Sequence, residues 1–255
     1  MSPAEALAVL AAGVGAGTIN TIVGSGTLLT FPVLLAVGLP PVTANVSNAL
    51  GLVPGSVTGA IGYRHELAGQ RDRLVRLGSV GLLGGATGAV LLVTLPSQAF
   101  HAIVPVLIAA ALVLVVLQPR LARSVQARRE RLGTAAPAHG GPLLVAGMFL
   151  ASVYGGYFGA AQGVLYLSLM GLLLDDTLQR INGLKNVLAA MVNGVAAVFF
   201  IIVAHMDWAA VGLIAAGATI GGLLGARVGR RLPPAALRAL IVVVGIAAIV
   251  QLVVA

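Results

Sequence analysis

Stretches of about twenty apolar residues, nearly free of charged side chains, follow one another along most of this chain. They lie at residues 43–62, 77–95, 99–118, 177–204, 208–227 and 234–254. A helix needs about 20 apolar residues to cross the hydrocarbon core of a bilayer, whereas buried strands are much shorter. The chain is 59% hydrophobic and 9% charged, and soluble domains carry about 25% charged residues. The sequence therefore predicts an all-α integral membrane protein rather than a soluble domain or an outer-membrane barrel.

Positive charge is concentrated in three of the connections between these stretches. Most of the 15 Lys and Arg residues fall in residues 63–76, 118–141 and 227–238. The other connections, at 38–43, 95–101 and 204–207, contain none. Loops rich in Lys and Arg stay in the cytoplasm, so the pattern predicts a multi-pass protein of the inner (cytoplasmic) membrane with the three basic loops inside. Because the net charge of +8 sits in these loops, it indicates topology and contact with the lipid bilayer rather than binding of nucleic acid.

Two further apolar regions, 4–38 and 142–174, are each interrupted partway along by small and polar residues. With the basic loops inside, the first region enters and leaves from the outer face and the second from the cytoplasmic face. Each would be a broken, re-entrant helical hairpin followed by three spans. The predicted fold is therefore two inverted repeats, 1–118 and 142–255, with about eight membrane helices and a cytoplasmic basic linker at 119–141. Within this region, the polar stretch at 124–142 reads as a flexible connector. Two full spans in place of each hairpin would leave the external topology unchanged.

The first interruption reads NTIVGSGTLLTFP and begins at Asn20. Gly24 and Gly26 permit a tight reversal of the chain, and the hydroxyl of Ser25 is suited to capping the next half-helix. Non-helical backbone at membrane depth is tolerated only inside protein or beside a water-filled cavity. The free N–H groups that open the half-helix, including that of Thr27, would favour an anion. Close packing of helices is the other use of such glycines.

Amide side chains in the adjoining spans extend this polar region. Asn45 and Asn48 share one face of a helix, and Asn182 and Asn186 share a face of another, with Lys185 beside them. A lysine in hydrocarbon costs at least about 2.5 kcal/mol, which favours an anion-binding role for Lys185. The alternative is a side chain that reaches back to interfacial water or to the aspartates at 175–176.

The second interruption, GGYFGAAQG, ends with Gln162 and Gly163 at the start of its returning half-helix. The predicted substrate-binding residues are Asn20, Gly24, Ser25, Gly26, Thr27, Asn45, Asn48, Gln162, Gly163, Asn182, Lys185 and Asn186. Secondary transporters built from inverted repeats bind substrate where the two repeats meet, near the middle of the bilayer. We therefore expect a small anion at this place.

Other kinds of chemistry have little support in the sequence. The chain has no cysteine, and its four histidines fall in loops or at the ends of spans, so neither a metal site nor a cofactor is expected. An intramembrane serine hydrolase would need a base near Ser25, and no histidine lies within a span, so we expect no enzyme. Every carboxylate lies outside the membrane centre, so a coupling ion, H⁺ or Na⁺, would be held by backbone carbonyls or travel with the substrate.

Two blocks of the sequence resemble the signature blocks of the TauE/SafE sulfite exporter family. They are residues 17–64, with the Gly-rich break, Pro32 and the Gly-Leu-Pro-Pro turn, and residues 154–208. The resemblance implies a permease for small anions such as sulfite, organosulfonates or a related small carboxylate or sulfur anion, working by alternating access. An anion channel or passive pore of the same fold is the alternative.

Overall fold

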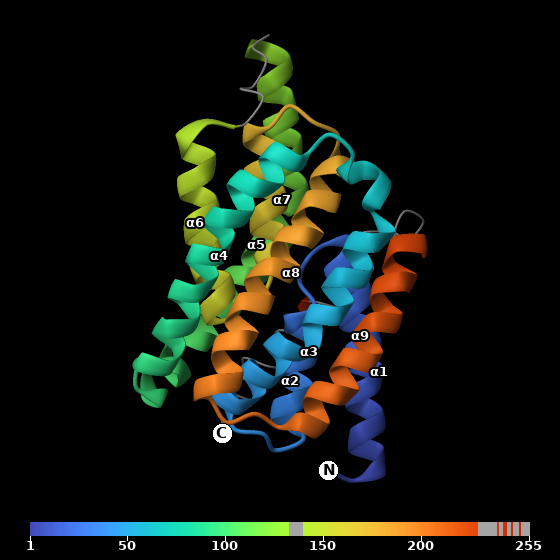
Figure 1. Ribbon diagram of the computed structural model, residues 1–255, viewed down its shortest axis with the longest axis vertical. Coiled ribbons are helices and arrows are strands. Elements are labelled where there is room, and N and C mark those ends of the chain that lie inside the picture. Colours follow the sequence, from blue (N-terminus) through green and yellow to red (C-terminus); the bar gives the residue numbers. More distant parts are fainter. Residues whose placement is uncertain (133–139, 229–238, 240–241, 244–245, 247–249, 251–255) are drawn as a thin grey trace.

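The structure of the protein is a computed structural model, and it describes residues 1–132 and 140–228 with a few residues of the C-terminal segment. Every regular element in these ranges is a helix (Figure 1). In chain order they are α1 (Pro3–Ile22), α2 (Thr27–Ala36), α3 (Pro41–Gly62), the short 3₁₀ helix η1 (Arg64–Leu67), α4 (Arg71–Thr94), α5 (Ser97–Leu132), α6 (Gly141–Tyr157), α7 (Gln162–Leu173), α8 (Leu178–Val203) and α9 (Trp208–Val228). The predicted span at 234–254 lies mainly outside the described residues.

The helices have the lengths and composition of a multi-pass membrane protein. Among the described residues, α1, α4, α8 and α9 are each long and apolar enough to cross a bilayer. Helix α3 has 22 residues, but its Asn, Ser and Thr side chains make it less apolar. Helices α2, α6 and α7 have 10, 17 and 12 residues, which is less than a full span needs.

The three short helices belong to two hairpins that start from opposite ends of the molecule. In Figure 1, α1 rises from the lower end and α2 returns to it, whereas α6 descends from the upper end and α7 returns there. The chain reverses after Ile22 in the first hairpin and after Tyr157 in the second. Each pair of helices, α1–α2 and α6–α7, therefore forms a hairpin whose two outer ends lie at the same end of the molecule.

Each hairpin packs on helices from the other half of the chain. Helix α1 packs most extensively on α9, and α6 packs on α4, while α3 and α8 contact each other between them. Glycines allow these close contacts, since a Cβ on Gly17 would lie 2.3 Å from the carbonyl oxygen of Ala218 and one on Gly156 would lie 2.1 Å from that of Gly85. The two halves thus share one interior.

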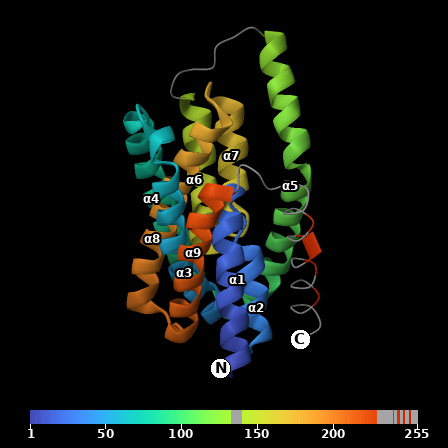
Figure 2. The same cartoon turned by 90° about the vertical axis from the view of Figure 1, so that its right-hand side faces the viewer.

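Helix α5 corrects one boundary predicted from the sequence. It continues to Leu132, so the prediction of a flexible connector is wrong for residues 124–132. This stretch is rich in Ala, Arg, Gln and Leu, which are good helix formers, and this preference outweighs the polar character that suggested a connector. Figure 2 shows the end of α5 extending beyond the neighbouring helices. Residues 133–139 of the predicted linker lie outside the described part of the chain.

Candidate functional site

Both hairpins turn at a glycine whose backbone is in the left-handed region. Gly24 has φ of +87° and Gly159 has φ of +75°. The N–H of Gly24 donates to the carbonyl of Ile19 over 3.1 Å, and the N–H of Gly159 donates to the carbonyl of Tyr154 over the same distance. A helix end of this kind favours glycine, because other residues are strained at such φ values. Gly159 thus has the place in the second hairpin that Gly24 has in the first.

The two turns touch each other, although they are far apart in the sequence. The N–H of Gly163 donates to the carbonyl of Gly24 over 2.9 Å. A Cβ on Gly24 would lie only 2.3 Å from the Cα of Gly163, so the two backbones are in direct contact. The structure therefore brings the two predicted interruptions together at one place inside the protein.

Three side chains of α8 converge on the last turn of α1. The ammonium group of Lys185 donates to the carbonyls of Asn20 at 2.7 Å and of Thr21 at 3.1 Å. The side-chain amides of Asn182 and Asn186 each donate to the carbonyl of Thr21 over 3.2 Å. The last carbonyls of a helix have no partner within it and carry the negative end of its dipole. These three residues therefore satisfy the broken end of α1.

Lys185 is an unusual side chain for the interior of a protein. Its side chain is fully buried, and the buried polar residues in the described part of the chain include no carboxylate. Lys185 does not reach back to the aspartates at 175–176, as the alternative from the sequence suggested. Two of its three N–H groups donate to α1, and the helix dipole offsets only about half a charge. The described site therefore holds no carboxylate that could balance the charge of a protonated Lys185.

The start of α2 offers free donors at the same place. Asn48 accepts a hydrogen bond from the hydroxyl of Thr30 and donates to that of Thr27 over 3.2 Å. The backbone N–H groups of Ser25, Gly26 and Thr27 have no acceptor among the described residues. The predicted cap by Ser25 is wrong, because Gly26 occupies the N-cap position without a side-chain bond and the buried Ser25 hydroxyl has no partner.

Helix α3 also reaches the second hairpin. The side-chain amide of Asn45 donates to the carbonyl of Tyr157, at the end of α6, over 2.9 Å. The amide oxygen of Asn45 and the hydroxyl of Tyr157 are both buried without a hydrogen-bond partner in the described structure. Buried polar atoms in proteins are nearly always paired, so this pair of oxygens and the Ser25 hydroxyl have unused bonding capacity.

Two predicted site residues point elsewhere. Gln162 donates over 2.6 Å to the hydroxyl of Tyr166, which is itself 2.7 Å from the hydroxyl of Ser152. The bond of Gln162 thus lies within α7, and Tyr166 connects it to Ser152 of α6 in the same hairpin. The side-chain amide of Asn20 donates over 3.2 Å to the hydroxyl of Ser56 on α3, while its carbonyl accepts from Lys185.

Sequence reasoning missed Thr30, Tyr157 and the carbonyl of Thr21. Thr30 lies one helical turn after Thr27, so its place on the same face could have been read from the spacing. Tyr157 is one of several aromatic residues near the second turn, and its unpaired hydroxyl depends on packing. The Thr21 carbonyl has no sequence signal, because every residue has one.

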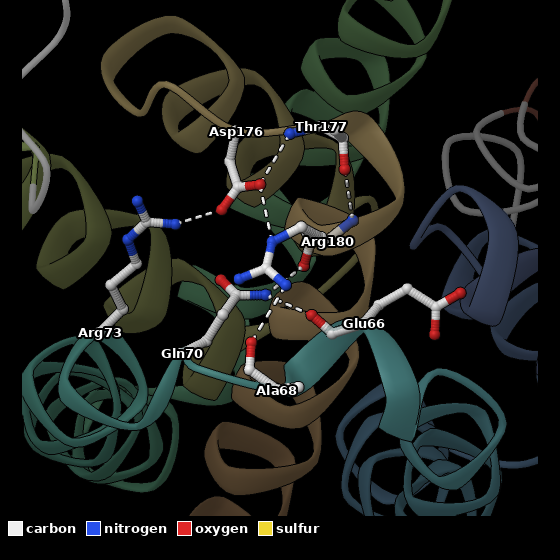
Figure 3. A network of polar contacts seen from close by, with 7 residues as sticks. All are labelled: Glu66, Ala68, Gln70, Arg73, Asp176, Thr177 and Arg180. Carbon is white, nitrogen blue, oxygen red and sulfur yellow. Dashed lines mark hydrogen bonds and ion pairs between the residues drawn. The ribbon is translucent and has the colours of Figure 1, made fainter.

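A second polar network lies at the end of the molecule where α7 leads into α8 (Figure 3). Asp176 accepts hydrogen bonds from Arg73 of α4 and, over 2.8 Å, from Nε of Arg180. Arg180 also donates to the carbonyl of Ala68, and Gln70 donates over 3.0 Å to the carbonyl of Arg180. These contacts connect the η1–α4 region to the start of α8.

These neighbours change the pKa of the Asp176 carboxyl group. Burial by itself raises its pKa, but the hydrogen bonds from Arg73 and the Thr177 amide, with the positive charge of Arg180, hold the pKa below its ordinary value. Asp176 is therefore ionised in the folded protein near neutral pH, and its charge is matched by the two arginines.

Proteins similar to this chain are named as probable membrane transporters. The "Probable membrane transporter protein YfcA" of Escherichia coli (strain K12) is 28% identical over 218 residues, which cover 85% of this chain and 76% of that protein. A "Probable membrane transporter protein" of Haemophilus influenzae is 26% identical over 216 residues, which cover 83% of this chain and 80% of the other. No solved structure matches the chain.

The family comparison covers nearly the whole molecule, including both hairpins and the helices around them. The family described as "Sulfite exporter TauE/SafE" matches residues 9–252. This range contains every residue of the site where the two turns meet, as well as the network at Asp176. The resemblance inferred from residues 17–64 and 154–208 is confirmed, and the chain belongs to the sulfite exporter TauE/SafE family.

Proposed function

We propose that the protein is a permease that moves a small anion across the membrane, binding it where the turns of the two hairpins meet. The observation that carries this proposal is the fully buried Lys185, which has no buried carboxylate near it in the described structure. The free N–H groups at the start of α2 add the positive end of a helix dipole. An anion would balance this charge, whereas a cation would be repelled.

The residues that would touch the anion are those with unused bonding capacity. The hydroxyls of Ser25 and Tyr157 and the N–H groups of Gly26 and Thr27 are donors without an acceptor in the described structure. Lys185 has one N–H group left after its two bonds to α1. Sulfonate, sulfite and carboxylate groups present several acceptor oxygens to such a set of donors, so sulfite, an organosulfonate or a small carboxylate is the proposed substrate.

The arrangement of the hairpins suggests how the site could open to each side. The first hairpin, with its three following helices, and the second hairpin, with its own, would be inverted repeats of about four helices each. Rocking one unit against the other would expose the junction of Gly24 and Gly163 first to one face and then to the other. We place the basic residues at 63–76, 118–141 and 227–238 in the cytoplasm, in the inner membrane. Among the described residues, the site holds no buried carboxylate to carry a coupling proton.

The test is anion flux in liposomes that contain the purified protein. Sulfite, sulfoacetate and acetate would be compared in uptake assays, with a potassium flux as the control for leakage. Uptake that saturates with concentration supports a permease, and uptake that rises linearly with a matching ion current supports the channel of the same fold. No flux of any of the three anions would overturn the proposal.

Two serine variants then address the site. Ser25→Ala removes a hydroxyl that has no partner in the protein, so we expect normal stability but an apparent affinity for the anion that is lower by about 10-fold or more. The matched control is Ser152→Ala, which breaks a buried bond to Tyr166 and should lower stability while leaving the affinity unchanged. Equal affinities in the two variants would remove Ser25 from the proposed site.

A further inference from the structure

An apolar groove runs along the outside of the protein between α4 and α6, away from the two turns. Its volume is about 420 Å³. It is lined by Arg76, Val80 and Leu83 of α4 and by Pro142, Val145, Ala146 and Phe149 of α6. Arg76 is the one charged side chain among these lining residues, and Leu83 is 66% exposed, so the groove opens outward.

The groove exists because α4 and α6 touch along one part of their length and diverge along another. A Cβ on Gly88 would lie 2.0 Å from the carbonyl oxygen of Val153, and one on Gly84 would lie 2.7 Å from that of Phe149. Nearer the start of α4 the contact is looser, since a Cβ on Gly81 would lie 3.7 Å from the hydroxyl of Ser152 of α6 and 3.4 Å from Val192 of α8. The two helices therefore separate toward their first residues.

The polar end of the groove is at the same face as the basic connections. Helices α4 and α6 both begin at the upper end in Figure 1, so Arg76 and Pro142 lie at the same end of the groove. From there to Leu83 on one helix and Phe149 on the other is seven residues, or about 10 Å along the axis. In the proposed orientation, Arg76 would lie at the membrane surface, and the apolar groove would lead from it into the bilayer.

Arg76 is available for a ligand. Its side chain is exposed and makes no hydrogen bond or ion pair with any described residue, whereas nearby Arg73 is engaged by Asp176. A guanidinium group pairs with a phosphate through two parallel hydrogen bonds, and it does so best where water is partly excluded. Basic pockets between membrane helices on the cytoplasmic side are suited to anionic lipid head groups.

We propose that the groove between α4 and α6 binds an anionic phospholipid, with one acyl chain between the helices and the head-group phosphate on Arg76. The groove supplies the contact for the chain, and Arg76 supplies the charge that distinguishes this lipid from a zwitterionic one. The lipid would fill the space where α6 separates from α4. It would thereby hold the first helical turn of α6, where the second hairpin begins, in place.

The experiment measures the melting temperature of the purified protein in a neutral detergent as phosphatidylglycerol is added. Phosphatidylcholine with the same acyl chains and water-soluble glycerol phosphate are added in parallel. We expect phosphatidylglycerol to raise the melting temperature in a dose-dependent way, with smaller shifts from the other two. Native mass spectrometry counts the bound lipid and the copies of the chain in each complex.

Three variants make the test specific. Arg76→Gln should lower the affinity for phosphatidylglycerol by about 10-fold or more. Arg71 is also exposed and lies at the start of the same helix, and Arg71→Gln should leave this affinity unchanged. Ala146→Leu narrows the groove and should weaken the binding of both phospholipids. Equal shifts from the two phospholipids, equal affinities of the two arginine variants, or a second copy of the chain that displaces the lipid would each overturn the proposal.

Discussion

The contact between the two turns can be tested by adding one methyl group at Gly24. In Gly24→Ala, the new Cβ would lie 2.3 Å from the Cα and 2.8 Å from the carbonyl carbon of Gly163. A Cβ does not come this close to a non-bonded atom, and the neighbour is backbone, so the two hairpins would have to move apart. The φ of +87° adds strain for any residue with a side chain.

The loss of stability in Gly24→Ala is the sum of the backbone strain and the overpacking. The left-handed conformation costs a non-glycine residue roughly 1–2 kcal/mol, and overpacking of a dense interior costs roughly 1–3 kcal/mol. We therefore expect Gly24→Ala to destabilise the protein by about 2–5 kcal/mol. Gly38 has nearly the same φ, +88°, but no atom lies within 4 Å of its Cβ position. Gly38→Ala should therefore lower the stability only by the cost of the left-handed backbone. Gly163→Ala has no such strain, and its Cβ would lie 2.4 Å from the Cα of Gly24, so it should cost the packing term alone.

The measurements are thermal unfolding in detergent and anion uptake in liposomes for all three variants and the wild type. Gly24→Ala and Gly163→Ala should lose uptake, because both separate the two turns. Gly38→Ala should keep uptake and lose only a little stability. If Gly24→Ala were no worse than Gly38→Ala in both assays, the turns would not be in the contact described above.

The remaining predictions concern the polar network and the orientation in the membrane. Because the pKa of Asp176 is lower in the folded protein than its ordinary value, its carboxylate stabilises the fold above about pH 4, and this contribution is lost as the pH falls through the lowered pKa. Asp176→Asn should therefore lower the melting temperature at pH 7, with a difference from the wild type that shrinks on acidification; a difference independent of pH would contradict this reasoning. Since the chain has no cysteine, single substitutions report topology directly. In intact cells a membrane-impermeant maleimide should label His205→Cys at the α8–α9 connection, but label Ala68→Cys only after permeabilisation, and the reverse pattern would invert the proposed orientation.

Much of the local structure can be predicted from the sequence. The lengths of the apolar stretches predict membrane helices. Gly24 and the small residues around it predict a break within the apolar region 4–38. These features are local, because the bilayer thickness and the backbone freedom of glycine act on each segment separately. The extension of α5 through residues 119–132 was missed, since a polar and basic stretch can be either a loop or the end of a long helix.

The chemistry of the site depends on contacts between distant segments. The sequence predicted Lys185 and its neighbouring asparagines as anion ligands, but it could not reveal that their donors satisfy the carbonyls at the end of α1. It also could not reveal which hydroxyls remain without partners, because Ser25 and Tyr157 are unpaired only as a result of packing. The sequence alone therefore determined a set of membrane helices, two breaks and a lysine within one of the spans. Only the tertiary structure decided that the breaks meet at Gly24 and Gly163, because hydrogen bonds between half-helices depend on where the other half of the chain is placed.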